Sequence, residues 1–279
     1  MLEARTLDDL AAIAIAAGDV LLTSRSGPLA TEMKADGSPV TAADRAANAL
    51  ILRRLAERFA GVTAVSEEGP PIDPQGPPPG VLFLVDPLDG TKEFIAGRDE
   101  FTVNLALVEN GEPVAGIVHA PARGALYAGG RLLGAWRAAV NRGKIGAREP
   151  IRAMSAAAGP LRIVTSRSHV NSETTAFIER YAVHTLRRLG SSLKFCLIAA
   201  GEADLYPRID HTMEWDTAAG DAILRAAGGS VRTLDGALLV YNKRGNPGQR
   251  DFINPGFVAA GAFDPFDPRL LKGGAVRTT

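Results

Sequence analysis

The stretch that decides the fold reads Val81-Leu82-Phe83-Leu84-Val85-Asp86-Pro87-Leu88-Asp89-Gly90-Thr91. Its five leading apolar residues predict a strand that is buried on both faces. The aspartates, proline, glycine and threonine that follow are typical of a turn. Two carboxylates at the mouth of a buried strand repel each other and lose hydration, so a positive group is expected between them. A hard cation with oxygen ligands, such as magnesium, is the usual solution.

Two other interpretations of this loop have to be weighed. Asp and Gly are common in turns, so the loop is also compatible with a purely structural role. Aspartyl-phosphate phosphatases place a nucleophilic Asp two residues before an Asp-Gly-Thr, and here Asp89, Gly90 and Thr91 form that triplet. The residue two positions before Asp89 is Pro87, which cannot be a nucleophile. The second interpretation therefore fails.

The composition limits the class of protein. The 279 residues suffice for a sizeable core and two subdomains, and 31 basic residues balance 31 acidic ones. No net field favours nucleic acid, and peripheral membrane association is not indicated. Cys196 is the only cysteine, which leaves no disulfide partner within the chain. Since neither a secretory leader nor a long apolar span is present, we expect a cytoplasmic protein.

Periodicity divides the chain into two parts. Apolar residues at helical spacing predict helices over 10–21 and 41–59, and strands are expected at 81–85, 101–108 and 113–120. The second part alternates strands at 161–165, 184–189 and 203–207 with helices at 172–181, 191–200 and 216–227. We predict an N-terminal α+β subdomain over residues 1–145 with most of the metal ligands. The C-terminal α/β subdomain over residues 146–279 carries the last ligand and the substrate-pocket residues.

Three further acidic positions stand out. Glu67 follows a short apolar run, Asp216 opens a predicted helix, and Asp44 lies three residues after Thr41. Each has a structural alternative. Glu67 is compatible with a solvated loop, Asp216 with a helix N-cap, and the Thr41–Asp44 pair with a capping box.

Together these acids carry a resemblance. Glu67-Glu68, the loop from Asp86 to Thr91 and Trp215-Asp216-Thr217-Ala218-Ala219-Gly220 occur in the order and spacing of the lithium-sensitive, magnesium-dependent inositol monophosphatase superfamily. The resemblance extends from Lys34 to the stretch at 254–257. It implies the sugar-phosphatase fold, a five-layered α-β-α-β-α sandwich of mixed α+β and α/β character.

Finer motifs are similar to one branch. Residues 86–94, 165–169, 190–195 and 203–208 resemble the 3'(2'),5'-bisphosphate nucleotidases, which remove the 3'-phosphate of 3'-phosphoadenosine 5'-phosphate, a by-product of sulfate assimilation. One departure is Ile209-Asp210-His211, where a smaller and less charged segment is expected. This segment borders the expected nucleotide pocket, so it bears on substrate preference and leaves the metal site unaffected.

The resemblance implies a set of metal ligands and catalytic residues. Two or three Mg²⁺ ions, for which Mn²⁺ is a possible substitute, would activate the attacking water, because all donors are oxygens. Asp44 would accept a hydrogen bond from the Thr91 hydroxyl and so orient or deprotonate that water, while Glu67 would act similarly through a water. The implied metal ligands are Glu67, Asp86, the Leu88 carbonyl oxygen, Asp89 and Asp216.

The substrate contacts follow the same resemblance. The main-chain amides of Gly90 and Thr91 would cradle the phosphate. Cations are expected to bind the two phosphates, and hydroxyl or imidazole groups the ribose or a phosphate. The residues expected to contact substrate are Gly90, Thr91, Lys92, Ser166, Arg167, Ser168, His169, Lys194, Arg208 and Asp216.

These expectations define a magnesium-dependent phosphatase that converts a small nucleotide bisphosphate, 3'-phosphoadenosine 5'-phosphate, to AMP and phosphate. The alternative is an inositol or other sugar monophosphatase, because shared metal ligands do not determine the leaving group. A non-catalytic metal- and nucleotide-binding protein is a third hypothesis. The sequence is compatible with a monomer or a homodimer.

Overall fold

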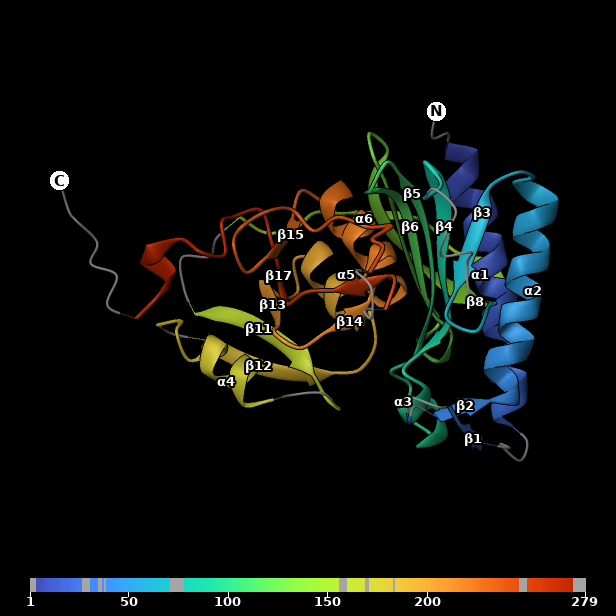
Figure 1. Cartoon of the computed structure of the whole chain (residues 1–279), viewed down its shortest axis with the longest axis horizontal. Helices are drawn as coiled ribbons and strands as arrows, with labels where there is room; N and C mark the ends of the chain where they lie inside the picture. The colour runs from blue at the N-terminus through green and yellow to red at the C-terminus, as the bar shows by residue number, and fades with distance from the viewer. Residues whose placement is uncertain are drawn as a thin grey trace.

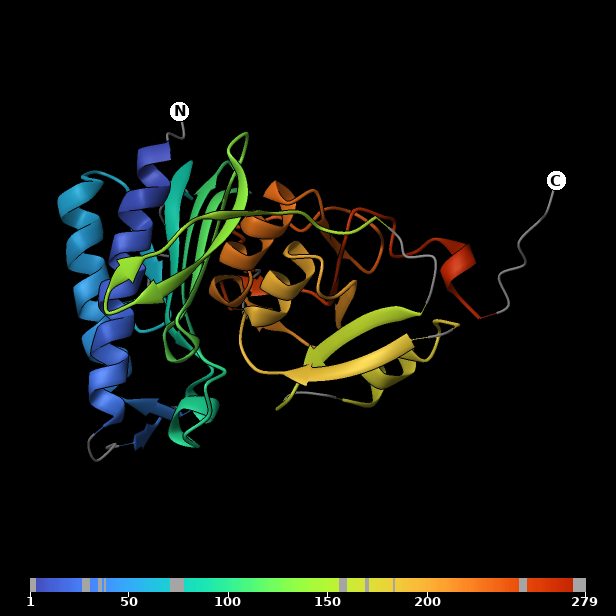
Figure 2. The same cartoon turned by 180° about the vertical axis from the view of Figure 1, so that it is seen from behind.

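Five layers are stacked across the molecule: two helices, a large sheet, two further helices, a smaller sheet and a last helix (Figure 1). This order confirms the predicted α-β-α-β-α sandwich. The reverse view shows the same stacking (Figure 2). The computed structural model describes residues 4–26, 31–34, 37, 39–70, 78–155, 160–168, 171–182, 184–245 and 250–272.

The large sheet has eight strands in the order β10-β8-β7-β6-β5-β4-β3, with β9 paired to β8. Strands β3 and β4 are parallel, and the other neighbours are antiparallel. The strands are β3 (Thr63–Ser66), β4 (Val81–Asp89), β5 (Thr102–Glu109), β6 (Glu112–Ala120), β7 (Ala125–Gly130), β8 (Gly134–Asn141), β9 (Lys144–Ile145) and β10 (Glu149–Ile151). The turn η1 (Pro121–Arg123) joins β6 to β7.

Strand β4 confirms the buried apolar run and corrects its end. The strand continues past Val85 to Asp89, where the sequence predicts a turn. It can do so because its register against β5 shifts between Asp86 and Asp89, so the local irregularity absorbs Pro87 without ending the pairing. The turn starts only at Gly90 and leads into the short helix α3 (Thr91–Ile95).

Two helices cover the outer face of this sheet, α1 (Ala4–Arg25) and α2 (Ala42–Arg58), next to a small hairpin of β1 (Thr31–Met33) and β2 (Pro39–Thr41). The predicted helix at 41–59 is confirmed, with Thr41 as its N-cap. The Asp44 carboxylate accepts the Thr41 N–H at 2.8 Å, which completes the capping box.

The smaller sheet has the order β12-β11-β13-β17-β15, with β11 parallel to both β12 and β13. Helix α4 lies on its outer side, while α5 and α6 lie between the two sheets (Figure 1). The elements are β11 (Leu161–Ser166), α4 (Ser172–Ile178), β12 (His184–Leu189), α5 (Leu193–Ala199), β13 (Leu205–Arg208), β14 (Thr212–Met213), η2 (Glu214–Asp216), α6 (Ala218–Ala226), β15 (Ser230–Thr233), β16 (Ile253–Asn254), β17 (Phe257–Ala260) and η3 (Pro268–Leu270).

The predicted helix at 216–227 is split in the structure. A single turn, η2, ends at Asp216, and α6 begins two residues later. Strand β10 lies beyond residue 145 yet pairs with β8 of the large sheet. The division of the chain near residue 145 stays a prediction.

Helix α6 lies unusually close to the large sheet. A Cβ at Gly116 in β6 would be 2.2 Å from the Ala219 carbonyl oxygen, and one at Gly129 in β7 would be 2.6 Å from the Ile223 Cα. Glycine is therefore required at both positions. Turn η2, which precedes α6, contacts β4 and β5. This packing brings Asp216 to the end of β4, although the two are far apart in sequence.

Cys196 is buried and unpaired in the core, and burial raises the pKa of its thiol. Among the residues that the structure describes, no helix combines the length and apolarity needed to cross a membrane.

The buried His119 should make the stability of the protein depend on pH. The ring is 2% exposed beneath α1, and burial lowers its pKa from 6.5 to about 4. Because the folded state disfavours the protonated ring, the contribution of His119 to the free energy of unfolding is complete above pH 6.5. This contribution is lost as the pH falls towards 4, and the loss is at most about 3 kcal/mol. Chemical denaturation of the wild type and of His119→Asn at pH 7 and pH 4.5 checks this. The variant should show a smaller loss of stability between the two pH values, and equal losses would contradict the assignment.

Candidate active site

A pocket of about 270 Å³ opens between the two halves of the molecule. The end of β4 and the start of α3 form one wall, and the C-terminal ends of β11 and β13, the start of α5 and turn η2 form the other. The predicted site residues that line it are Glu67, Asp86, Leu88, Asp89, Gly90, Thr91, Lys92, Ser166, Ser168, Lys194, Arg208 and Asp216.

The end of β4 has a defined local geometry. The Leu88 N–H donates to the Asp86 carboxylate at 3.0 Å, so the irregular part of the strand is tied to its own side chain. Gly90 adopts a φ of +94°, and a Cβ there would be 2.9 Å from the Glu100 carbonyl oxygen. Only glycine makes this turn without strain, which places Thr91 directly at the pocket wall.

The carboxylates of the pocket destabilise one another's ionised forms. Burial and the nearby carboxylates raise the pKa of Asp86 and of Asp216 well above the usual range. Burial also raises the pKa of Glu67 despite the opposing Lys34 ammonium. Because a positive charge stabilises the ionised form of a buried carboxylate, a cation in this pocket would lower these pKa values again.

The donor set fits a metal in its chemistry and position. The carboxylates of Glu67, Asp86, Asp89 and Asp216 line one pocket with the Leu88 residue, and all are oxygen donors. Among the described residues, however, no three Asp, Glu, His or Cys side chains converge on a point where an ion would fit. The fit therefore rests on the oxygen chemistry of the donors and on the pocket they share, and each carboxylate also has a protein partner.

Lys34 is one of those partners. Its ammonium lies 2.8 Å from the Glu67 carboxylate and also pairs with Glu68. Burial opposes the effect, but these two carboxylates raise the pKa of Lys34. The lysine thus supplies positive charge at the position of a predicted metal ligand. The sequence analysis did not single it out, although it lies in the acid-containing segment 34–44.

The predicted catalytic pair is assembled. The Thr91 hydroxyl lies 3.3 Å from one Asp44 oxygen and 3.2 Å from the Leu88 carbonyl oxygen. The other Asp44 oxygen accepts the Thr41 hydroxyl at 2.6 Å. Asp44 is 2% exposed, so the capping box of α2 also fixes the acid that faces Thr91. The structural and the catalytic interpretations of Thr41 and Asp44 are therefore compatible.

Ser192 is a site residue that the sequence analysis missed. Its hydroxyl contacts the Asp89 carboxylate and the Asp216 carbonyl oxygen, both at 2.8 Å, and so links two of the predicted metal ligands. Asn104 on β5 donates to the Ser192 hydroxyl at 2.8 Å. The run Gly190-Ser191-Ser192 before a helix was the available signal, but nothing local indicates that Ser192 faces two distant acids.

Two of the predicted cations lie in the pocket. Lys194 is 5% exposed, and burial lowers its pKa to about 8. Its ammonium donates to the Ser191 carbonyl oxygen and lies 5.0 Å from the centre of the Tyr206 ring. Arg208 is also buried, and it pairs with Asp210 at 3.7 Å. Both cations are positioned to meet an anion.

Arg167 has a different position. It does not line the pocket, and its guanidinium forms two hydrogen bonds of 2.9 Å with the Glu100 carboxylate. Ser168, which does line the pocket, donates to Glu93 at 2.6 Å. Both contacts join the end of β11 and the residues after it to the segment 93–100. His169 lies outside the described residues.

The departing segment Ile209-Asp210-His211 follows β13 beside the pocket. Besides the Arg208–Asp210 pair, His211 Nδ1 lies 3.0 Å from the Asn254 carbonyl oxygen. Asp210 therefore pairs with Arg208, a cation that is predicted to bind phosphate.

Comparisons with known proteins identify a family and several relatives of this chain. Residues 3–271 match the inositol monophosphatase family. The chain is 42% identical to the 3'(2'),5'-bisphosphate nucleotidase CysQ of Salmonella typhimurium over 90% of this chain and 98% of that protein. The crystal structure of CysQ from Bacteroides thetaiotaomicron matches with a TM-score of 0.76 and 37% identity, over 91% and 97% of the two chains. Inositol monophosphatase from Anabaena gives a TM-score of 0.71 and 26% identity, over 93% and 91%.

Proposed function

The chain belongs to the inositol monophosphatase family, and from this we propose that it is a metal-dependent 3'(2'),5'-bisphosphate nucleotidase. It hydrolyses the 3'-phosphate of 3'-phosphoadenosine 5'-phosphate to give AMP and phosphate. The observation that carries this choice is the 42% identity to CysQ over nearly the full length, against 26% to an inositol monophosphatase. The buried cations Lys194 and Arg208 in the pocket add support.

The proposed metal is Mg²⁺, with two or three ions and with Mn²⁺ as a possible substitute. Glu67, Asp86, Asp89, Asp216 and the Leu88 carbonyl oxygen would hold it. When bound, the ions supply positive charge to the phosphate oxygens and make water a better nucleophile at neutral pH. The mutual repulsion of the carboxylates and their oxygen-only chemistry support this assignment.

The residues around the ions perform the remaining steps. A water oxygen forms a bond to phosphorus, the bond from phosphorus to the 3'-oxygen breaks, and that oxygen takes up a proton. The Thr91–Asp44 pair orients the attacking water and accepts its proton, since the Thr91 hydroxyl borders the pocket and is held by Asp44. Glu67 acts similarly through a water.

The nucleotide is bound by groups from the C-terminal half. Lys194 and Arg208 pair with the phosphates, and Ser166, Ser168 and His169 contact the ribose or a phosphate. Lys92 and the amides of Gly90 and Thr91 border the scissile phosphate. Arg167 acts from outside the pocket, where it holds Glu100. We further propose that the protein is cytoplasmic and that it is a monomer or a homodimer.

The test is phosphate release from 3'-phosphoadenosine 5'-phosphate and from inositol 1-phosphate, each with Mg²⁺ and with a chelator. We expect turnover that requires Mg²⁺ and favours the nucleotide by at least about tenfold in kcat/KM, ~1.4 kcal/mol of transition-state preference. A preference for inositol phosphate would keep the metal site and reject the nucleotide pocket. Lack of turnover with both would favour a binding protein.

A further inference from the structure

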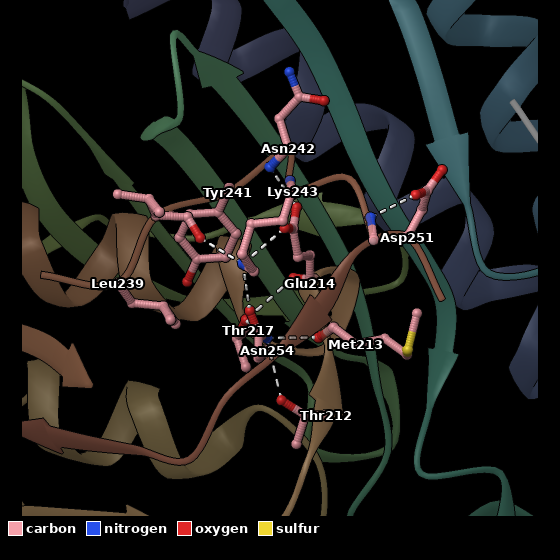
Figure 3. Close-up of polar contacts among 12 residues, drawn as sticks. Thr212, Met213, Glu214, Thr217, Leu239, Tyr241, Asn242, Lys243, Asp251 and Asn254 are labelled. Atoms are coloured by element: carbon pink, nitrogen blue, oxygen red, sulfur yellow. Dashed lines mark hydrogen bonds and ion pairs between the residues drawn. The ribbon is translucent and has the colours of Figure 1, made fainter. Parts of the chain in front are cut away.

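A fully buried carboxylate lies directly behind the pocket without lining it. Glu214, the first residue of η2, is 0% exposed and precedes Asp216 by two residues. Its oxygens accept the main-chain N–H groups of Asn242 and of Lys243, the latter at 2.9 Å, and pair with the Lys243 ammonium at 2.7 Å (Figure 3). One side chain thus joins η2 to the segment 242–243, which comes from a distant part of the chain.

Asn254 on β16 extends this cluster. It is also fully buried, and its side-chain oxygen Oδ1 accepts a hydrogen bond from the Lys243 ammonium at 3.0 Å. Its amide nitrogen lies within 3.1 Å of the Thr212 hydroxyl, the Met213 carbonyl oxygen and the Thr217 hydroxyl (Figure 3). Asn254 therefore contacts the chain on both sides of η2.

These contacts converge on Asp216. The Met213 N–H donates to the Asp216 carboxylate at 2.9 Å, and the Met213 carbonyl oxygen is held by Asn254. The Thr217 hydroxyl closes the turn onto the Glu214 carbonyl oxygen at 3.2 Å. The direction of the Asp216 carboxylate thus depends on main-chain groups that the cluster fixes from behind.

Burying these charged groups costs free energy. A buried ion pair loses hydration, and apolar residues of similar volume are often equally stabilising. The polar cluster fixes the orientation of the groups it contacts, because the hydrogen bonds of Glu214 and Asn254 are satisfied in one side-chain geometry. Groups behind metal ligands commonly orient them in this way, and their loss costs about 10–100-fold in metal affinity or activity.

We propose that Glu214, Lys243 and Asn254 form a positioning cluster that sets the direction of the Asp216 carboxylate for metal binding. The inference rests on the proposed function, since it takes Asp216 as a metal ligand. Glu214 is a positioning residue and touches neither metal nor substrate. The cluster acts on only one of the proposed metal ligands. Its loss should therefore change the metal affinity more than it changes the fold as a whole.

The chain offers a matched control in Asp221. This carboxylate is also 0% exposed, and it lies on α6, where it pairs with Arg225 at 2.8 Å and accepts the Tyr241 hydroxyl at 3.0 Å. Its side-chain partners are separate from those of Asp216. Asp221→Asn therefore removes a buried charge from α6, the helix that follows η2, where the hydrogen bonds of the carboxylate go to Arg225 and Tyr241 and not to Glu214, Lys243 or Asn254.

The experiment titrates Mn²⁺ into the wild type, Glu214→Gln and Asp221→Asn by calorimetry without substrate, and measures the melting temperature of each metal-free protein. We expect both variants to melt earlier. Glu214→Gln should bind Mn²⁺ about 10–100-fold more weakly than the wild type, whereas Asp221→Asn should stay within about threefold. Hydrogen exchange of the Met213 amide should accelerate in Glu214→Gln and not in Asp221→Asn.

A second variant guards against a failure to fold. Glu214→Gln leaves the Lys243 charge buried without its partner, so the double variant Glu214→Gln/Lys243→Met removes both charges together. It should keep the weakened Mn²⁺ binding, because the contact of Lys243 with Asn254 is also lost. Wild-type affinity in the double variant, or equal losses in Glu214→Gln and Asp221→Asn, would overturn the proposal. Failure of the wild type itself to bind Mn²⁺ would instead reject the proposed function on which it rests.

Discussion

Replacing Asp86 by Asn is expected to abolish turnover while it makes the metal-free protein more stable. Asp86 is 1% exposed, and burial together with the neighbouring carboxylates raises its pKa well above the usual range. An Asn oxygen can still accept the Leu88 N–H, so the end of β4 keeps its shape. The amide lacks the charge that binds a cation. We expect kcat to fall about a thousandfold or more, ~4 kcal/mol of transition-state stabilisation.

Two measurements check this prediction: kcat with saturating Mg²⁺, and the melting temperature in the presence of a chelator. Asp204→Asn is the matched control, because Asp204 is equally buried but pairs with Arg162 at 2.6 Å, away from the pocket. The control should lose stability and keep its turnover, which is the opposite pattern. An Asp86→Asn protein that retained turnover would contradict the proposed metal site.

Lys194→Met is expected to raise KM for the nucleotide bisphosphate about 100-fold and to leave kcat within a few-fold. Within the described part of the chain, main-chain carbonyl oxygens hold this buried ammonium and no carboxylate pairs with it. A hydrogen bond between charged groups contributes about 1.5–3 kcal/mol, and two phosphates are the anions available in the substrate. Methionine keeps an unbranched side chain that can pack against the Tyr206 ring, and it removes the ammonium that lies over this ring.

The control for this variant is a second substrate. Any residual hydrolysis of inositol 1-phosphate should change little in Lys194→Met, because that substrate lacks the second phosphate. A parallel loss with both substrates would mean that the lysine acts on the shared scissile phosphate. An unchanged KM for the bisphosphate would exclude Lys194 from the nucleotide pocket.

Lys194 also predicts the alkaline limb of the pH profile. Burial lowers its pKa to about 8, so the protonated, phosphate-binding form is lost as the pH rises through that value. In the wild type, kcat/KM for the bisphosphate should therefore fall above about pH 8. The limb should be weaker in Lys194→Met, which a comparison of the two profiles between pH 7 and pH 9.5 measures.

Elements with strong local signals were predicted well. The apolar run of β4, the Thr41 cap of α2 and the acids at 67, 86, 89 and 216 are all readable because each signal lies within a few consecutive residues. Strand β7 was not predicted, since its sequence Ala125–Gly130 is rich in small residues. Those small residues are required by the close approach of α6, which is a long-range contact.

The sequence by itself therefore determined the sandwich class, the four acids that line the pocket and the Thr91–Asp44 contact. Only the tertiary structure decided that β4 continues through Pro87, that Ser192 joins Asp89 to Asp216, and that Arg167 pairs with Glu100 outside the pocket. The physical reason is separation along the chain. The signal for a cap or an apolar run lies in adjacent residues. The partner of a polar side chain in these contacts comes from a segment 24 to 103 residues away, and packing decides which segment that is.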